Sequence, residues 1–175
     1  MDQTFQSGSQ RLRCHVKLAA PRIGGRDDPG VILCHGFPQS PLDARQSAGT
    51  FPQLVDRIAF TTGLSAMTFT FRGCGDSTGD FSLQGWIDDL RTAIDHLLEV
   101  ASVERCVLVG TNTGGSIAIC VGADDPRVSA AALVSARADF DDWADHPRRF
   151  LDHARELGAV RTPGFPASMD DWAVS

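Results

Sequence analysis

The sequence predicts an α/β fold with a mainly parallel sheet and helices on both faces. Short, continuous apolar runs at residues 31–34 and 106–109 are typical of strands that are covered on both sides. Segments with helical periodicity separate these runs, and the clearest one covers residues 83–99. Strands that alternate with helices favour right-handed crossover connections and hence a parallel sheet.

The amino-terminal part is expected to begin with two antiparallel strands. Apolar side chains at Leu12, Cys14, Val16 and Leu18 alternate with polar ones, which is typical of a half-buried strand. In chain order we expect strands over residues 4–5 and 11–18, a loop over 21–30, a strand over 31–34, a helix over 51–62 and a strand over 66–71.

The next helix, over residues 83–99, has the most regular apolar stripe. The side chains expected on its inner face are Leu83, Trp86, Ile87, Leu90, Ile94, Leu97 and Leu98, whereas Asp88, Asp89, Arg91, Asp95 and Glu99 are expected to face water. After it we expect strands over 106–109 and 130–134 and helices over 115–122 and 147–157.

Composition excludes several classes of function. The 175 residues carry a net charge of −6 with dispersed Lys and Arg, so no nucleic-acid partner is expected. The longest apolar runs have the length of strands, so no membrane span is expected. The five cysteines lack C-x-x-C spacing, which indicates reduced thiols in a cytoplasmic protein and no metal site or cofactor.

Residues 107–116, V-L-V-G-T-N-T-G-G-S, have the layout of a nucleophile elbow. In the strand–turn–helix motif G-x-S-x-G, glycines flank the nucleophile because its tight turn leaves no room for side chains. Gly110 and Gly114 take the glycine positions, and Asn112 takes the nucleophile position. A neutral amide is not a competent nucleophile as a serine, cysteine or carboxylate can be.

Three motifs in this order resemble the α/β-hydrolase family. They are His35-Gly36-Phe37-Pro38, the R-G-x-G-x-S loop within residues 71–77, and the elbow. The resemblance implies that the backbone N–H groups of Phe37 and Thr113 form the oxyanion hole. It also implies that His35 holds its loop by hydrogen bonds. The overall sequence is similar to those of bacterial esterases and serine aminopeptidases, and this similarity implies activity on small esters or amides.

Two departures from the family pattern concern catalysis. Asn112 replaces the nucleophile, and the sequence ends after what we count as strand six of the family's eight, before the usual acid and histidine. We therefore expect an α/β-hydrolase core over residues 1–138 that lacks its last two strands, and the start of a helical cap-like segment over 139–175. Asp139 is a candidate acid, although a carboxylate at a helix start is the favoured interpretation.

Other candidate groups are interpreted as structural. His146 and His153 are expected on the surface, and Cys34 and Cys74 are expected to be buried and inert. A carboxylate nucleophile at residue 112, as in dehalogenases and epoxide hydrolases, would require hydrolysis of the Asn112 amide.

The sequence thus predicts a hydrolase relative with impaired or no catalysis. One alternative is an active hydrolase whose full product is longer. Another is a binding module that holds a small ester, amide or carboxylate in the pocket without turnover. Strand 130–134 is expected at the sheet edge, where an uncharged apolar strand favours self-association.

Overall fold

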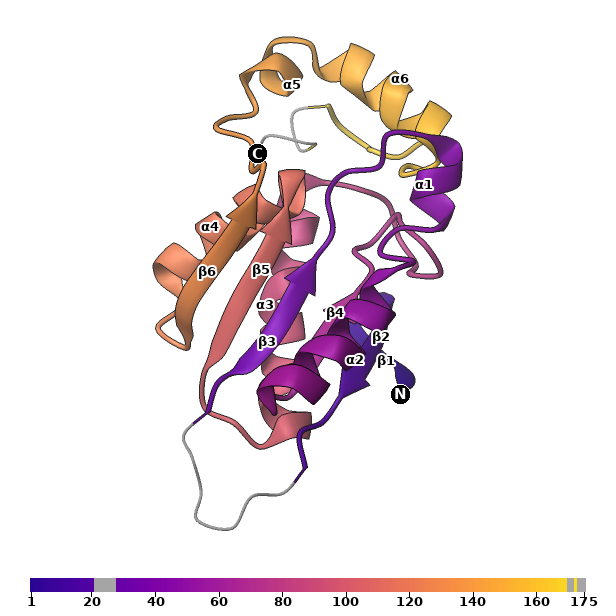
Figure 1. The fold of residues 1–175 in the computed structure, drawn as a ribbon. Helices are drawn as coiled ribbons and strands as arrows, with labels where there is room; N and C mark the ends of the chain where they lie inside the picture. The colour runs from indigo at the N-terminus through magenta and orange to yellow at the C-terminus, as the bar shows by residue number, and fades with distance from the viewer. Residues whose placement is uncertain (21–27, 170–171, 173–175) are drawn as a thin grey trace.

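Six strands form one sheet in the order β1-β2-β4-β3-β5-β6 (Figure 1). The computed structural model describes residues 1–20, 28–169 and 172. The strands are β1 (Asp2–Ser7), β2 (Gln10–Lys17), β3 (Gly30–Cys34), β4 (Ala66–Phe69), β5 (Cys106–Thr111) and β6 (Val128–Val134). β2 pairs antiparallel with β1 and β4, and the other pairs are parallel. The expected α/β fold with a mainly parallel sheet is confirmed.

Helices cover both faces of this sheet. They are α1 (Pro41–Arg45), α2 (Phe51–Thr62), α3 (Leu83–Ala101), α4 (Asn112–Asp124), α5 (Asp141–Asp145) and α6 (Pro147–Leu157). α2 packs on one face through Val55 and Ala59, whereas α3 and α4 lie on the other face (Figure 1). α5 and α6 lie beyond the carboxyl ends of the parallel strands, above the elbow.

The expected ranges of α2 and α6 agree with the structure, and α3 extends two residues beyond its expected end. The other helices differ. α4 begins at Asn112, three residues before the expected start, because the turn of the chain is completed within a single residue. The short α1 was not expected. The sequence marks this helix only through the residues at its start. Ser40 Oγ accepts the Asp43 N–H at 3.1 Å as the N-cap, and Pro41 is the first helical residue.

Asp89 on α3 was expected to face water, and this is wrong. Its side chain is 0% exposed and accepts hydrogen bonds from the Arg72 guanidinium at 2.7 Å and from the Arg72 N–H at 2.9 Å. The indole of Trp86 donates to the Arg72 carbonyl at 3.0 Å. A buried carboxylate needs such a partner, and here the pair anchors the 71–77 loop to α3.

An aromatic cluster joins the 139–169 segment to the rest of the core. Trp143 of α5 stacks on Phe150 of α6 with ring centroids 3.9 Å apart, and both rings contact Phe37 and Phe81. Each of these large rings removes apolar surface from water, so the cluster fixes the cap-like segment over the end of the sheet. The boundary at 138/139 stays a prediction.

β6 forms one edge of the sheet, as expected. All but its first residue are exposed, and Leu133 and Val134 are 40% and 57% exposed. No other strand of the described residues pairs with its outer side. Most of the loop expected over 21–30 lies outside the described residues, as do 170–171 and 173–175. No helix among the described residues is long and apolar enough to cross a membrane.

Candidate active site at the elbow

The chain turns sharply between β5 and α4, and Asn112 stands at the turn. Asn112 has φ of 49°, in the left-handed region. Asparagine tolerates this region better than most residues, which gives a local reason for an amide side chain here. The apex residue thus has the strained backbone that places a side chain at the carboxyl end of the sheet.

The flanking glycines are required by close backbone contacts. A Cβ at Gly110 would lie 2.5 Å from the Cα of Gly115, and a Cβ at Gly114 would overlap the carbonyl of His35. At Gly36 a Cβ would lie 2.8 Å from the Cβ of Asn112. The His35–Pro38 loop and the elbow therefore pack against each other so closely that these positions admit only hydrogen.

The Asn112 side chain is turned back onto its own helix. Its Oδ1 accepts the Thr113 N–H at 2.8 Å and lies 3.3 Å from Thr113 Oγ1. This bond fixes the orientation of the amide, because only the oxygen can accept from a backbone N–H. The Nδ2 group consequently keeps two donors, and neither has a partner among the described residues.

The two backbone N–H groups expected to form an oxyanion hole differ in whether they already have a hydrogen-bond acceptor. The Thr113 N–H is already engaged by Asn112 Oδ1, and Thr113 is fully buried. The Phe37 N–H donates to no group within the described part of the chain. The side chain of Asn112 therefore occupies one expected donor and leaves the other unengaged.

His35 lies beside the elbow with both ring nitrogens engaged. Its Nε2 accepts the Phe71 N–H at 3.1 Å, so the proton resides on Nδ1, which donates to the Gly36 carbonyl at 2.8 Å. The residue is 4% exposed, and burial lowers the pKa of the imidazole to about 4. His35 thus ties its own loop to the 71–77 loop and has no free nitrogen to accept a proton.

Asp139 lies apart from the elbow cavity and is exposed. Its Oδ1 accepts the Asp141 N–H at 3.3 Å at the start of α5, and its backbone carbonyl accepts from Arg137 Nε. This is the position of a helix-start carboxylate. His146 and His153 are also exposed, the first beside the Asp145 carbonyl and the second 4.0 Å from Glu156.

Nucleophiles other than residue 112 are poorly placed for chemistry. Burial raises the pKa of the Cys34 thiol, and raises that of Cys74 to about 12. Ser116 donates its hydroxyl to the Arg137 carbonyl at 2.8 Å, away from the cavity. Among the described residues, no group of three or more His, Cys, Asp or Glu side chains could hold a metal ion.

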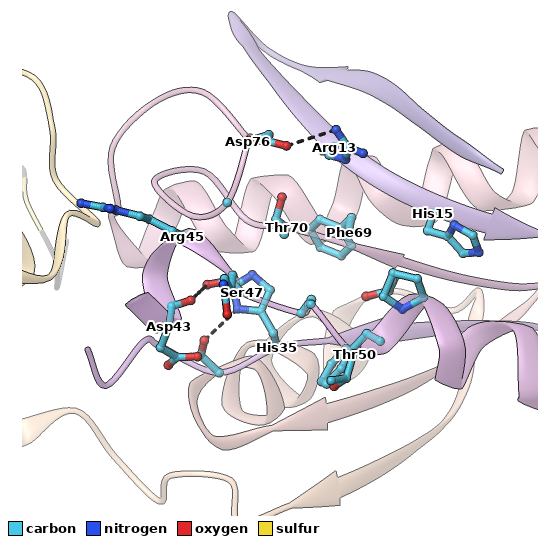
Figure 2. A pocket seen from close by; sticks show the side chains of 18 of the residues that line it. Arg13, His15, His35, Asp43, Arg45, Ser47, Thr50, Phe69, Thr70 and Asp76 are labelled. Carbon is cyan, nitrogen blue, oxygen red and sulfur yellow. Dashed lines mark hydrogen bonds and ion pairs between the residues drawn. The ribbon is translucent and has the colours of Figure 1, made fainter. Parts of the chain in front are cut away.

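A cavity of about 890 Å³ opens beside Asn112 and runs under α1 towards β2. Asn112, Thr111 and Phe37 line one part of it, and the hydroxyl-bearing residues Ser47 and Thr70 line another. Figure 2 shows His35 near one end and His15 at the other, with Thr70 and Phe69 between them. The sequence did not indicate this cavity, because the segment over 38–50 that forms one wall, and that includes α1, has no periodic pattern.

The far end of this cavity holds a charged cluster that the sequence analysis also missed. His15 Nδ1 lies 2.7 Å from Asp2, and His15 Nε2 lies 3.0 Å from Asp56 of α2. Both nitrogens face carboxylate oxygens, and the hydrogen bonds to His15 lower the pKa of both carboxyl groups. Asp2 and His15 are directly opposite each other in the hairpin formed by β1 and β2. This pairing is the feature from which their contact could have been anticipated.

Comparison with known proteins agrees with the observed fold. The family model described as the alpha/beta hydrolase family matches residues 31–174. An uncharacterized protein of Salmonella typhimurium, YfhR, is 37% identical over 75 residues, which is 39% of this chain and 26% of that protein.

Solved structures of similar fold come from several organisms. A putative alpha/beta hydrolase from Agrobacterium tumefaciens has a TM-score of 0.67 at 20% identity and covers 82% of this chain and 65% of its own. The alpha/beta hydrolase GrgF from Penicillium has a TM-score of 0.69 at 23% identity over 89% and 52% of the two chains. A serine hydrolase without lid from Xanthomonas campestris has a TM-score of 0.63 at 22% identity over 81% and 65%.

The chain spans about a quarter of the length of the curated relatives it matches, and less than two thirds of these solved structures. The family match nevertheless covers most of the chain, including the His35 loop, the 71–77 loop and the elbow. The chain therefore belongs to the alpha/beta hydrolase family.

Proposed function

We propose that this protein is a catalytically impaired relative of the hydrolases that act on carboxylic esters or amides. The observation that carries the proposal is the state of Asn112, whose Oδ1 is held by the Thr113 N–H. An amide nitrogen in place of a hydroxyl or carboxylate cannot form the covalent intermediate of this reaction class. The same bond also removes one of the two expected oxyanion donors.

The state of the histidines in the described part of the chain supports this proposal. His35 accepts the Phe71 N–H with the nitrogen that would have to accept a proton, and its pKa of about 4 favours the neutral form. His15 is held between two carboxylates at the other end of the cavity. Without a nucleophile and its base, only modest acceleration from binding remains.

Hydrolysis of p-nitrophenyl acetate tests the proposal, with the Asn112→Ala variant as the matched control. We expect the purified chain and the variant to have the same rate, close to that of buffer containing an equal amount of an unrelated protein. A rate that is well above this background and is lost in Asn112→Ala would refute impaired catalysis. It would favour the alternative, an active hydrolase within a longer protein.

A second candidate function is favoured by the two donors at the cavity. Asn112 Nδ2 and the Phe37 N–H have no partners among the described residues, and both residues line the cavity. Two such donors suit a carbonyl or carboxylate oxygen, so a small ester, amide or carboxylate is the expected ligand. Asn112 would then bind this group where other family members would attack it.

Thermal unfolding in the presence of short carboxylic acids and their amides tests this binding function. A ligand that binds the native state raises the unfolding temperature by mass action. We expect a concentration-dependent rise that is reduced in Asn112→Leu, which keeps the branched shape of the side chain and removes the donors. An equal rise in both proteins, or no rise with any ligand, would contradict binding at Asn112.

We further propose that the edge of β6 pairs with a second copy of the chain. This strand is uncharged and is exposed at every residue but the first, and unpaired backbone groups on such an edge are a template for pairing. Light scattering after size exclusion should report a dimer, which Leu133→Lys disrupts and Ala123→Lys, at an exposed position of α4, does not. A monomeric parent protein would refute this pairing.

The five cysteines support a reducing compartment, the cytoplasm, as the location of the protein. All five are unpaired, and four of them are buried. Fractionation of cells that produce the full natural protein tests this, and recovery from a secreted fraction would contradict it.

A further inference from the structure

A second cavity, of about 500 Å³, lies between α1 and α6, on the side of α1 away from the elbow. Its charged lining residues are Arg45, Arg155, Arg161 and Glu156. These residues come from α1, from α6 and from the segment after α6. Three guanidinium groups therefore gather around one hollow in a chain whose net charge is −6. We refer to this hollow as the arginine pocket.

Two of the three guanidinium groups are positioned by backbone carbonyls. Arg161 Nη2 donates to the Gly73 carbonyl at 2.8 Å and Arg161 Nε donates to the Gly158 carbonyl at 2.8 Å. Arg155 Nη2 donates to the Phe165 carbonyl at 3.0 Å. Carbonyls orient a guanidinium but do not neutralise its charge, so both groups stay available to an anion.

Arg45 is the least engaged of the three. It is exposed, and its guanidinium makes no hydrogen bond or ion pair with any described residue. Figure 2 shows its side chain extending from α1 towards the pale yellow carboxyl-terminal ribbon. Arg155 and Arg161 line the same cavity as Arg45. α1 itself is held in place by its Ser40 cap and by the Gly75 N–H, which donates to the Ala44 carbonyl at 2.8 Å.

The residues that line the arginine pocket keep an excess of positive charge, with three arginines against Glu156. Asp152 does not line the pocket; it forms an exposed ion pair with Arg155 Nη1 at 3.6 Å, which contributes little at the surface. Glu156 lines the pocket, but it lies 4.0 Å from His153 Nδ1 and its side chain is largely exposed. Asp80 accepts the backbone N–H groups of Arg161 and Thr162 rather than a guanidinium.

We propose that the arginine pocket binds the carboxylate or phosphate group of a small organic anion. Guanidinium groups present planar pairs of donors that match the oxygens of both anions, and such charge-assisted hydrogen bonds are the strong ones. Arg45 and Gly75 line both cavities, so an anion bound here lies next to the elbow cavity. The proposal does not depend on whether Asn112 binds a ligand or permits catalysis.

The test is a titration at low salt followed by nuclear magnetic resonance of the backbone amides, with inorganic phosphate and acetate as separate probes. We expect saturable shifts at Gly75, Gly158 and Arg161 that weaken as sodium chloride is raised. Arg45→Gln should weaken binding by about 5-fold or more, because it removes a charge-assisted donor without removing a structural contact. Tighter binding of phosphate would identify a phosphate group as the recognised one, and tighter binding of acetate a carboxylate.

Arg148→Gln provides the matched control, because Arg148 is an exposed residue of α6 that does not line the pocket. It carries the same change in net charge, so it should alter binding by less than about 2-fold. Arg155→Gln is the second test variant and should weaken binding as Arg45→Gln does. Absence of saturable binding by both anions, or an equal loss in Arg148→Gln, would overturn the proposal.

Discussion

Lowering the pH from 7 to 5 should destabilise the fold by about 2 kcal/mol through His35 alone. Burial lowers the pKa of this imidazole from 6.5 in the unfolded chain to about 4 in the fold. Between these values the unfolded state binds the proton more readily, so stability is fully present above pH 6.5 and is lost as the pH falls. By pH 4 the loss should reach about 3 kcal/mol.

The assay is urea unfolding at a series of pH values for the parent chain and for His35→Gln. The difference in pH dependence between them isolates His35 from other groups that lose stability in acid, such as Asp2 and Asp56, whose pKa values are lowered by His15. His153→Gln, at an exposed histidine of α6, is the control variant and should not reproduce the effect of His35→Gln. The reasoning is refuted if His35→Gln has the same pH dependence as the parent chain.

Two substitutions test the packing around the site. Gly114→Ala should destabilise by about 3 kcal/mol or more, because its Cβ would overlap the His35 carbonyl, which is backbone and cannot rotate away. Gly158→Ala, at φ of 79° with nothing within 4 Å, should lose only about 1–2 kcal/mol, and equal losses in urea unfolding would contradict the close contact. Asp89→Asn should destabilise by about 3–5 kcal/mol, because it leaves a partly buried guanidinium without its counter-charge. Asp88→Asn on the exposed face of the same helix should change stability by less than about 1 kcal/mol, and calorimetric melting that ranks the two variants equally would refute the role of the buried pair.

Elements with a clear apolar pattern could be predicted from the sequence. The strand at residues 31–34 and the helices over 51–62 and 147–157 were placed to within a residue, because burial on one face or both leaves a direct pattern in the side chains. The parallel order of the central strands followed from the alternation of strands and helices. Where the pattern is absent, as in the short α1, only local capping chemistry remained as a signal.

Asp89 shows where helical periodicity stops being sufficient. The period gives the angular position of a side chain around the helix. It does not show which residue from another part of the chain packs against that position. Arg72 lies in a loop 17 residues earlier in the sequence and forms an ion pair with Asp89. Asp89 is therefore buried, although its position on the helix is near the side that faces water. The arginine in the glycine-rich 71–77 loop was the one feature of the sequence that could have indicated a carboxylate partner on the neighbouring helix.

The elbow was predictable in its backbone but not in its hydrogen bonds. The spacing of Gly110 and Gly114 indicates a turn that admits no side chain on either flank, and the close contacts at both glycines agree with that indication. The rotation of the Asn112 amide onto the Thr113 N–H is a rotamer choice that no sequence pattern reports. The arginine pocket likewise joins residues that are far apart in the sequence, so only the folded chain brings them together.

The most direct test of the central claim is reaction with a fluorophosphonate, followed by intact-mass spectrometry. This reagent captures an activated nucleophile whatever the substrate, so it does not depend on guessing the ester. If Asn112 makes the elbow unreactive, the mass of the chain stays unchanged. A stoichiometric adduct that forms on the folded chain, and is abolished by unfolding before the reagent is added, would contradict the claim.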